Sequence, residues 1–286
     1  MQGLAGRQLL RWQIVLMAAL LGVSRSAAGG DPAPTLQPVT IRAFENYVAA
    51  TETRIGKNLT QANFFWVDEL PKQKKEEAYE RLKSGKVELR QVSKEEAGWD
   101  GAIPGGMIHD WQGMVFIPGA KLDEVLSLLQ DYDHHATYYA PDVERAKIEA
   151  HNGDHFRVFM RFRRKKIVTV VLNTEQEITY YRDSPGRAHS RSSAIRIAEV
   201  ENAGTRQEKE KTPGEDNGFM WRLETWWQME ERDGGVYIQN EAVSLTRDIP
   251  LMLAWMIEPF VTSIPKESVE FTLGATREAV QKSGKG

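Results

Sequence analysis

The sequence contains no cysteine, which excludes disulfide bonds, thiolate metal sites and a cysteine nucleophile. It also lacks a Gly-x-Ser-x-Gly elbow, a phosphate-binding glycine loop, a dinucleotide fingerprint and a His-Glu-x-x-His motif, so the commonest enzyme classes have no support. A net charge of −3 gives no general attraction to nucleic acid. What remains is an ordinary globular composition, with 41% hydrophobic and 27% charged residues over 286 positions. That length fits one large or two small domains.

Residues 1–28 have the three parts of a secretory signal peptide. Arg7 and Arg11 precede a short apolar run over 14–23, and small residues follow at 26–28. We expect cleavage after Ala28 and a periplasmic or secreted mature protein. The alternative is an uncleaved N-terminal membrane anchor, which the short apolar run disfavours because a membrane span needs ~20 residues.

The next segments divide into a linker, an accessory region and a main domain. Residues 29–38 form a Pro-rich linker, and residues 39–104 form an N-terminal helical accessory region. In this region we expect a helix that begins near Thr40, with apolar residues at helical spacing, and a second helix over 72–83. Charged and apolar residues alternate over 86–92, which favours a short strand.

The main domain, residues 105–281, shows a strand, two short helices, further strands and a long final helix. An Asn152-Gly153 pair between two strand-like runs is a strong hairpin signal. Ser263 is placed to cap the last helix, with Pro265 in its first turn. The expected strands are 107–117, 143–150, 155–164, 167–181, 187–200, 219–229 and 236–245, and the expected helices are 121–130, 133–139 and 263–282.

Two stretches carry a resemblance to a known superfamily. Residues 109–143 (HDWQGMVFIPGAKLDEVLSLLQDYDHHATYYAPDV) and 241–279 (EAVSLTRDIPLMLAWMIEPFVTSIPKESVEFTLGATREA) resemble the START and Bet v 1-like (SRPBCC) proteins, which include polyketide cyclase-like and coenzyme-Q-binding members. The chain looks especially like exported bacterial members. The resemblance implies an α+β helix-grip fold, in which a curved antiparallel sheet of about seven strands wraps a long C-terminal helix, here with an N-terminal helical extension. It also implies a cavity for an apolar molecule, but no catalytic residue.

The aromatic strand 219–229 supplies most of the predicted ligand surface. Alternate residues of a strand share one face, so Trp221 and Trp227 should face the cavity. Trp226 should point the other way, partly exposed or beneath the N-terminal helices. The same aromatic residues would serve equally well as plain core. The predicted ligand-binding set is Phe219, Trp221, Leu223, Trp227, Met229, Trp255, Phe260, Val269 and Leu273.

Two further segments have both a functional and a structural interpretation. The apolar run 251–261 would serve as a lid, as a membrane-surface contact during loading, or as a buried helix start, which is favoured. The basic run 157–166 would contact anionic lipid head groups or form a solvated strand face, and the solvated face is favoured. Asn58-Leu59-Thr60 matches a glycosylation acceptor by chance.

Titratable residues do not converge on one point in the sequence pattern. Adjacent residues point apart on a helix or strand, so neither His134 with His135 nor His109 with Asp110 forms a metal site. His151 and His155 flank the hairpin turn, where a metal site is disfavoured. By alternation, the strand carboxylates should face solvent. These carboxylates are Glu175, Glu177 and Glu241. We expect no metal and no cofactor.

Three functional hypotheses follow. The first is an exported, non-enzymatic protein that holds a lipid, quinone or other apolar molecule. The second is a cyclase- or hydratase-like enzyme, which requires acid and base groups in the same cavity. The third is a structural or partner-binding envelope protein, in which the N-terminal helices fill or cover the cavity. The residues that would serve the second hypothesis are Glu241, His109, Asp110 and His134.

Overall fold

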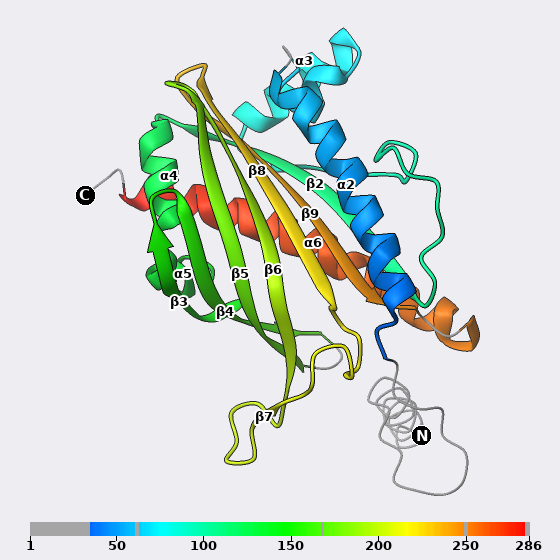
Figure 1. The fold of residues 1–286 in the computed structure, drawn as a ribbon. Helices are drawn as coiled ribbons and strands as arrows, with labels where there is room; N and C mark the ends of the chain where they lie inside the picture. Colours follow the sequence, from blue (N-terminus) through cyan, green and yellow to red (C-terminus); the bar gives the residue numbers. More distant parts are fainter. Residues whose placement is uncertain (1–34, 61–62, 167–168, 249–250, 284–286) are drawn as a thin grey trace, which may run out of the picture.

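A single antiparallel sheet forms the frame of the protein, as the computed structural model shows (Figure 1). The structure describes residues 35–60, 63–166, 169–248 and 251–283, and for residues 251–262 it describes the backbone only. The strand order is β1-β2-β9-β8-β6-β5-β4-β3, and β7 pairs with β6. The strands are β1 (Glu88–Gln91), β2 (Gly106–Pro118), β3 (Val143–Asn152), β4 (His155–Lys165), β5 (Thr169–Ser184), β6 (Arg187–Glu201), β7 (Lys209–Glu210), β8 (Arg222–Arg232) and β9 (Gly235–Arg247).

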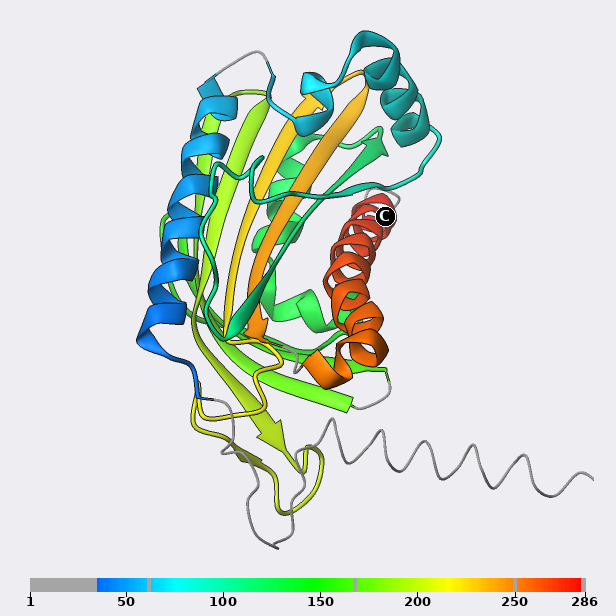
Figure 2. The same cartoon turned by 90° about the vertical axis from the view of Figure 1, so that its right-hand side faces the viewer.

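The α+β helix-grip prediction is confirmed, because this curved sheet faces a long C-terminal helix (Figure 2). Each of the seven predicted main-domain strands forms, and two short strands bring the sheet to nine. One of these, β1, lies in the accessory region yet pairs with β2. The Asn152-Gly153 turn joins β3 to β4 as predicted, and Gly153 adopts a φ of +60°, which glycine tolerates best.

Helix α2 (Pro38–Thr60) lies on the outer face of the sheet, and Figure 2 shows the sheet between α2 and α6. Its apolar side chains Phe44, Val48 and Ile55 are buried, at the helical spacing expected from the sequence. They pack with Trp226 of β8 and with Val243 of β9. Trp226 therefore lies beneath the N-terminal helix, one of the two positions predicted for it.

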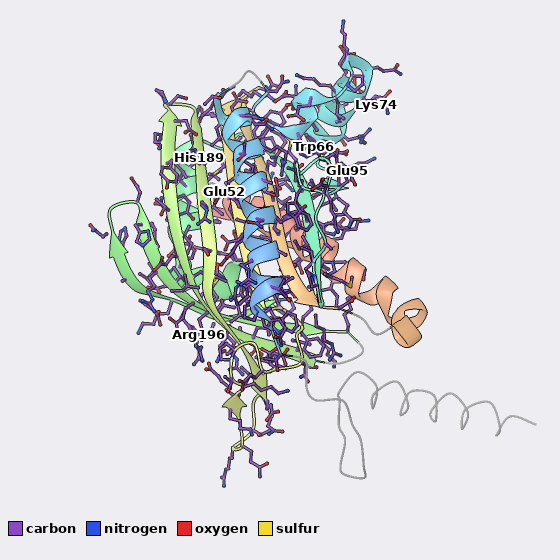
Figure 3. The ribbon with its side chains drawn as sticks, turned by 45° about the vertical axis from the view of Figure 1, so that its right-hand side comes forward. Glu52, Trp66, Lys74, Glu95, His189 and Arg196 are labelled. Atoms are coloured by element: carbon purple, nitrogen blue, oxygen red, sulfur yellow. The ribbon has the colours of Figure 1, made fainter. Side chains whose placement is uncertain are left out.

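A short helical turn and a second helix extend this outer layer. Helix η1 (Trp66–Glu69) is attached by buried amides: Gln228 Nε2 donates to Phe64 O at 2.6 Å, and Trp66 N donates to Gln239 Oε1 at 2.9 Å. Helix α3 (Lys72–Lys83) has the predicted bounds. Figure 3 shows Trp66 and α2 on the same side of the sheet. The accessory region therefore covers the outer face.

Helix α6 (Leu251–Ser283) crosses the inner face as one continuous element of 33 residues. The expected start at Ser263 is wrong, and Pro265 lies inside the helix. An interior proline removes one backbone hydrogen bond but need not end a helix whose neighbouring turns remain bonded. Where α6 meets β2, Gly113 permits the close approach: a Cβ there would lie 2.5 Å from Leu273 and 2.7 Å from Val269.

Three short elements close one end of the inner face. They are α4 (Leu122–Gln130), η2 (Tyr132–His134) and α5 (His135–Tyr138), close to the two short helices predicted. Their apolar residues join the inner face and the C-terminal half of α6 in one hydrophobic cluster. In the part of the chain that the structure describes, no helix has the length and apolarity needed to cross a membrane.

Candidate functional site

The pairing register assigns each residue of the central strands to a face. Ser190, Trp227, Asn240 and Gly113 form one row across β6, β8, β9 and β2. Gly113 lies against α6, so this row and the rows two residues away on either side line the inner face. Intervening residues such as Trp226 belong to the outer face.

The inner face has two unequal halves. Toward α4 and α5 it is fully packed, since Val115, Met229 and Ile238 have no exposed surface. Toward the start of α6, Leu223 and Trp227 remain partly exposed although they lie on a central strand. Within the described residues, α6 packs mainly on β2 and β9 and also on β1, α4 and α5, while β4 reaches it through the bond from Arg164 to Ser268. This second half is therefore incompletely covered.

Other apolar side chains share this partial exposure. Leu223 and Phe162 pack beside Leu172, and Trp227 packs on the edge of the main core. A filled interior would bury side chains in the middle of a covered sheet face. Their residual exposure shows that solvent reaches this part of the inner face. The partly buried apolar residues bordering it are Phe162, Val170, Leu223, Trp227, Ala242 and Phe271.

Five of the nine predicted ligand-binding residues lie where the sequence placed them. Leu223, Trp227, Met229, Val269 and Leu273 lie on the inner face or on the side of α6 that packs against it. Of these, Met229, Val269 and Leu273 are buried in the packed core, so Leu223 and Trp227 are the two next to the incompletely covered region.

The alternating faces predicted for residues 219–229 do not hold for the residues before β8, which starts at Arg222. Trp221 is 4% exposed and packs with α2 residues on the outer side, where its Nε1 donates to Asp216 Oδ1 at 3.0 Å. Phe219 lies in the segment before the strand, and its amide donates to Glu199. The expectation that both share a face with Trp227 is wrong for Trp221, because β8 starts at Arg222. The side chains of Trp255 and Phe260 lie outside the described residues.

A band of uncharged polar residues crosses the same inner face, and sequence reasoning missed it. Ser192 Oγ donates to Gln176 Oε1 and Gln176 Nε2 donates to Thr174 Oγ1, each at 3.1 Å. Asn240 Nδ2 donates to Trp226 O at 3.3 Å. Ser190 is 1% exposed, and its Oγ has no hydrogen-bond partner among the described residues. The alternation itself would have placed these residues, had the polar positions been read together.

Only one of the four proposed acid–base suppliers lies on the inner face. His109 is 2% exposed, and its Nε2 lies 3.0 Å from Thr246 Oγ1. Burial lowers the pKa of His109 to about 4, so the imidazole is neutral at physiological pH. Asp110, the next residue along β2, faces outward as predicted from strand alternation.

Asp110 and Glu241 belong to a buried charged cluster beneath α2. Tyr47 Oη donates to Asp110 Oδ2 at 2.8 Å, while Arg54 and Gln112 both bond to Glu241. Burial, reinforced by the Glu241 carboxylate, raises the pKa of Asp110 well above its ordinary value. The expectation that Glu241 faces solvent is wrong, because α2 covers its face of the sheet and Glu241 is 1% exposed.

The remaining titratable candidates do not assemble a site. His134 is exposed and bonds to Asp131, while His135 is buried among tyrosines, so the two diverge as predicted. Burial lowers the pKa of His135 to about 4. No group of three metal-ligating side chains occurs among the residues that the structure describes. Glu175 is partly buried and Glu177 is exposed.

The basic run is largely neutralised by ion pairs. Arg161 pairs with Glu144 at 3.0 Å and with Glu208 at 2.9 Å, and it is only 7% exposed. Arg157 and Lys166 also pair with glutamates. These pairs differ from the freely solvated strand face that we expected, and they weaken the case for head-group contact.

Two open hollows lie beside α3 rather than on the inner face. Their volumes are about 410 and 680 Å³, and the larger is lined by Tyr79, Lys83, Arg232 and other mostly charged side chains. A lining of this kind does not suit an apolar molecule. The incompletely covered inner half remains the candidate site.

The chain is similar to several solved structures at low sequence identity. One from Thermus thermophilus is 16% identical, with 60% of this chain and 97% of that chain covered and a TM-score of 0.44. A STAR-related lipid transfer protein from Xanthomonas axonopodis is 16% identical, with 64% and 97% covered and a TM-score of 0.42. An aromatase/cyclase from a Streptomyces species is 10% identical, with 62% and 95% covered and a TM-score of 0.40.

No protein-family model matches the chain, and no curated protein matches it. The chain is similar to a STAR-related lipid transfer protein and to an aromatase/cyclase, both at TM-scores below 0.5, so the resemblance to the START and Bet v 1-like superfamily rests on the sequence stretches and on the helix-grip architecture described above. Such distant similarity extends to the fold alone, and the function must be argued from the site.

Proposed function

We propose that this protein is an exported binder of a small apolar molecule, such as a lipid or quinone, held between the inner face of the sheet and α6. The partial exposure of Trp227 and Leu223, in the middle of a face that α6 crosses, carries the proposal. A ligand would bury these side chains at about 25 cal/mol per Å² of apolar surface, before the cost of ordering is subtracted.

The first turns of α6 are the proposed entrance. Their sequence, residues 251–261, is strongly apolar, and Figure 1 shows them projecting past the end of the sheet. An apolar segment at this position suits the entry of an apolar molecule or contact with a membrane during loading. The export proposal rests on residues 1–28, and N-terminal sequencing of the mature protein tests cleavage after Ala28.

The enzymatic alternative receives less support. It required acid and base groups in one cavity, yet Asp110 and Glu241 lie beneath α2 and His134 is exposed on a short helix. His109 is the remaining supplier. The structural or partner-binding alternative required the N-terminal helices to fill or cover the cavity, and these helices lie on the outer face instead.

Native mass spectrometry of the mature protein, purified from its own host, tests the proposal. We expect a stoichiometric extra mass that organic extraction releases as an apolar molecule. A mass equal to that of the bare chain in every preparation, with no extractable compound, would contradict a binding role.

A further inference from the structure

The inner face offers hydrogen bonds but no charge at its centre. Its central rows carry hydroxyl and amide side chains from four neighbouring strands, β5, β6, β8 and β9. These side chains extend along the inner face from the row of Trp227 toward the end of the sheet where α6 starts. They are Thr174, Gln176, Ser190, Ser192, Thr225, Asn240 and Ser244.

Charged side chains in register with the inner face occur only at the ends of the described strands, and each has a partner. Arg164 bonds to Asp142 and to Ser268 of α6. Glu231 accepts from the Leu122 amide and from Lys121, at the start of α4. The other two are Glu199, which accepts from the amides of Asn217 and Phe219, and Arg182, which bonds to Asp123.

The border of the inner face beside β2 also carries a charge. Lys266, an exposed residue of α6, lies with its Nζ 6.0 Å from the centre of the Trp111 ring. Among the described residues, Lys266 makes no contact with the row formed by Ser190, Trp227 and Asn240. A charged ligand group at that row would therefore lose its hydration without gaining a partner of opposite charge.

Two residues of the central row retain hydrogen-bonding capacity. Ser190 is buried, and its hydroxyl has no partner among the described residues. Asn240 makes one bond through Nδ2, which leaves its amide with donor and acceptor positions to spare. The two residues lie on either side of Trp227, two strand spacings or about 10 Å apart. An unpaired polar group in such a position costs free energy unless a partner reaches it.

We propose that the inner face selects an uncharged, largely apolar molecule that stacks on Trp227 and carries hydroxyl or carbonyl groups that bond to Ser190 and Asn240. This inference rests on the proposed binding function and narrows its ligand class. Hydrocarbons without oxygen leave the Ser190 hydroxyl unpaired. Carboxylates and phosphates bring a charge that this part of the face does not neutralise. The selectivity is therefore set by the polar band rather than by apolar area.

Three probes that share one ring system test this selectivity by calorimetry on the mature protein at pH 7: naphthalene, 2-naphthol and 2-naphthoate. We expect 2-naphthol to bind about tenfold tighter than naphthalene and at least about tenfold tighter than 2-naphthoate. Asn240→Leu and Ser190→Ala should each reduce the preference for 2-naphthol over naphthalene while leaving the affinity for naphthalene within about twofold.

Ser193→Ala is the matched control, because Ser193 lies on the outer face and bonds to Glu224. It should leave the preference unchanged. Ser190→Ala removes only an unpartnered hydroxyl, so it keeps the test valid if Asn240→Leu fails to fold. Equal binding of naphthalene and 2-naphthol, or tightest binding of 2-naphthoate, would overturn the inference and leave the binding function standing. Binding of none of the three, together with a bare mass from the host, would overturn both.

Discussion

The two faces of the same sheet are covered in different ways. On the outer face, α2 contributes Arg54 and Tyr47 to a buried cluster with Asp110 and Glu241 of the sheet. On the inner face, α6 contributes apolar residues such as Leu273, and the centre of the sheet presents uncharged polar side chains. Charged pairs fix a permanent cover in one geometry, because each ion needs its partner in place. The face whose centre carries no charge is the one suited to a ligand that enters and leaves.

The largest expected effect comes from the outer cluster. Glu241→Gln removes the anion that pairs with Arg54, and leaving a largely buried cation without its partner should cost about 3 kcal/mol of unfolding free energy. Urea unfolding at pH 7 measures the loss. Glu177→Gln, at an exposed position of β5, is the matched control and should cost less than about 0.5 kcal/mol. Equal losses in the two variants would contradict the outer cluster as a fixed cover.

The adjacent tryptophans of β8 sharpen the comparison. Trp226 is 5% exposed beneath α2, so Trp226→Leu should destabilise the protein by about 2 kcal/mol through the cavity it leaves. Trp227 is partly exposed on the inner face, and Trp227→Leu should cost about 1 kcal/mol or less in protein stripped of ligand. Urea unfolding of the delipidated variants checks the order. A larger loss at Trp227 would mean that the inner half is packed core.

The buried Asp110 makes stability depend on pH. Its pKa is raised in the folded protein by burial and by Glu241, whereas an unfolded aspartate has a pKa of about 3.9. The folded state therefore binds the proton more tightly, and this contribution is fully present below about pH 4 and is lost as pH rises toward the folded pKa.

Asp110→Asn removes this titration and keeps an acceptor for Tyr47. Near pH 4 the variant should be no more stable than the wild type, and it should gain stability relative to the wild type as pH rises to 8. Urea unfolding across that pH range gives the two curves. Parallel curves would show that Asp110 is ionised in the folded protein.

The smallest effect is expected at the basic run. Arg157 is exposed on the outer face of β4, between Glu149 at 3.6 Å and Glu175. Arg157→Gln should change the unfolding free energy by less than about 1 kcal/mol, because exposed ion pairs are screened by water. The same urea titration, repeated at high salt, should show no difference between the variant and the wild type. A loss above 2 kcal/mol would make this run part of the structural core.

Local patterns predicted the fold because each long strand and α3 follows its own periodicity. Alternation also placed Trp226 and Trp227 on opposite faces, as the pairing of β8 with β9 confirms. Alternation placed Glu241 on the correct, outer face but predicted it to be exposed. Glu241 is buried because α2, almost 190 residues away in sequence, covers it. The face predicted for Trp221 is wrong because Trp221 precedes β8, and strand alternation applies only within the strand.

The site was only partly predictable for the same reason. Leu223 and Trp227 stood out as apolar residues on one face, whereas Ser190 and Asn240 have no distinguishing mark along the chain. They become neighbours of Trp227 only through the register of β6, β8 and β9. The start of α6 was misplaced because Pro265 is a good signal for a first turn and is tolerated in this long helix.

The most direct test of the difference between the two faces is native mass spectrometry of two variants purified from the host alongside the wild type. Both Trp226→Leu and Trp227→Leu change one tryptophan of β8 to the same residue. We predict that Trp226→Leu retains the co-purifying apolar molecule at the wild-type ratio, and that Trp227→Leu loses most of it. Loss from the Trp226 variant with retention by the Trp227 variant would place the ligand on the outer face and contradict the account.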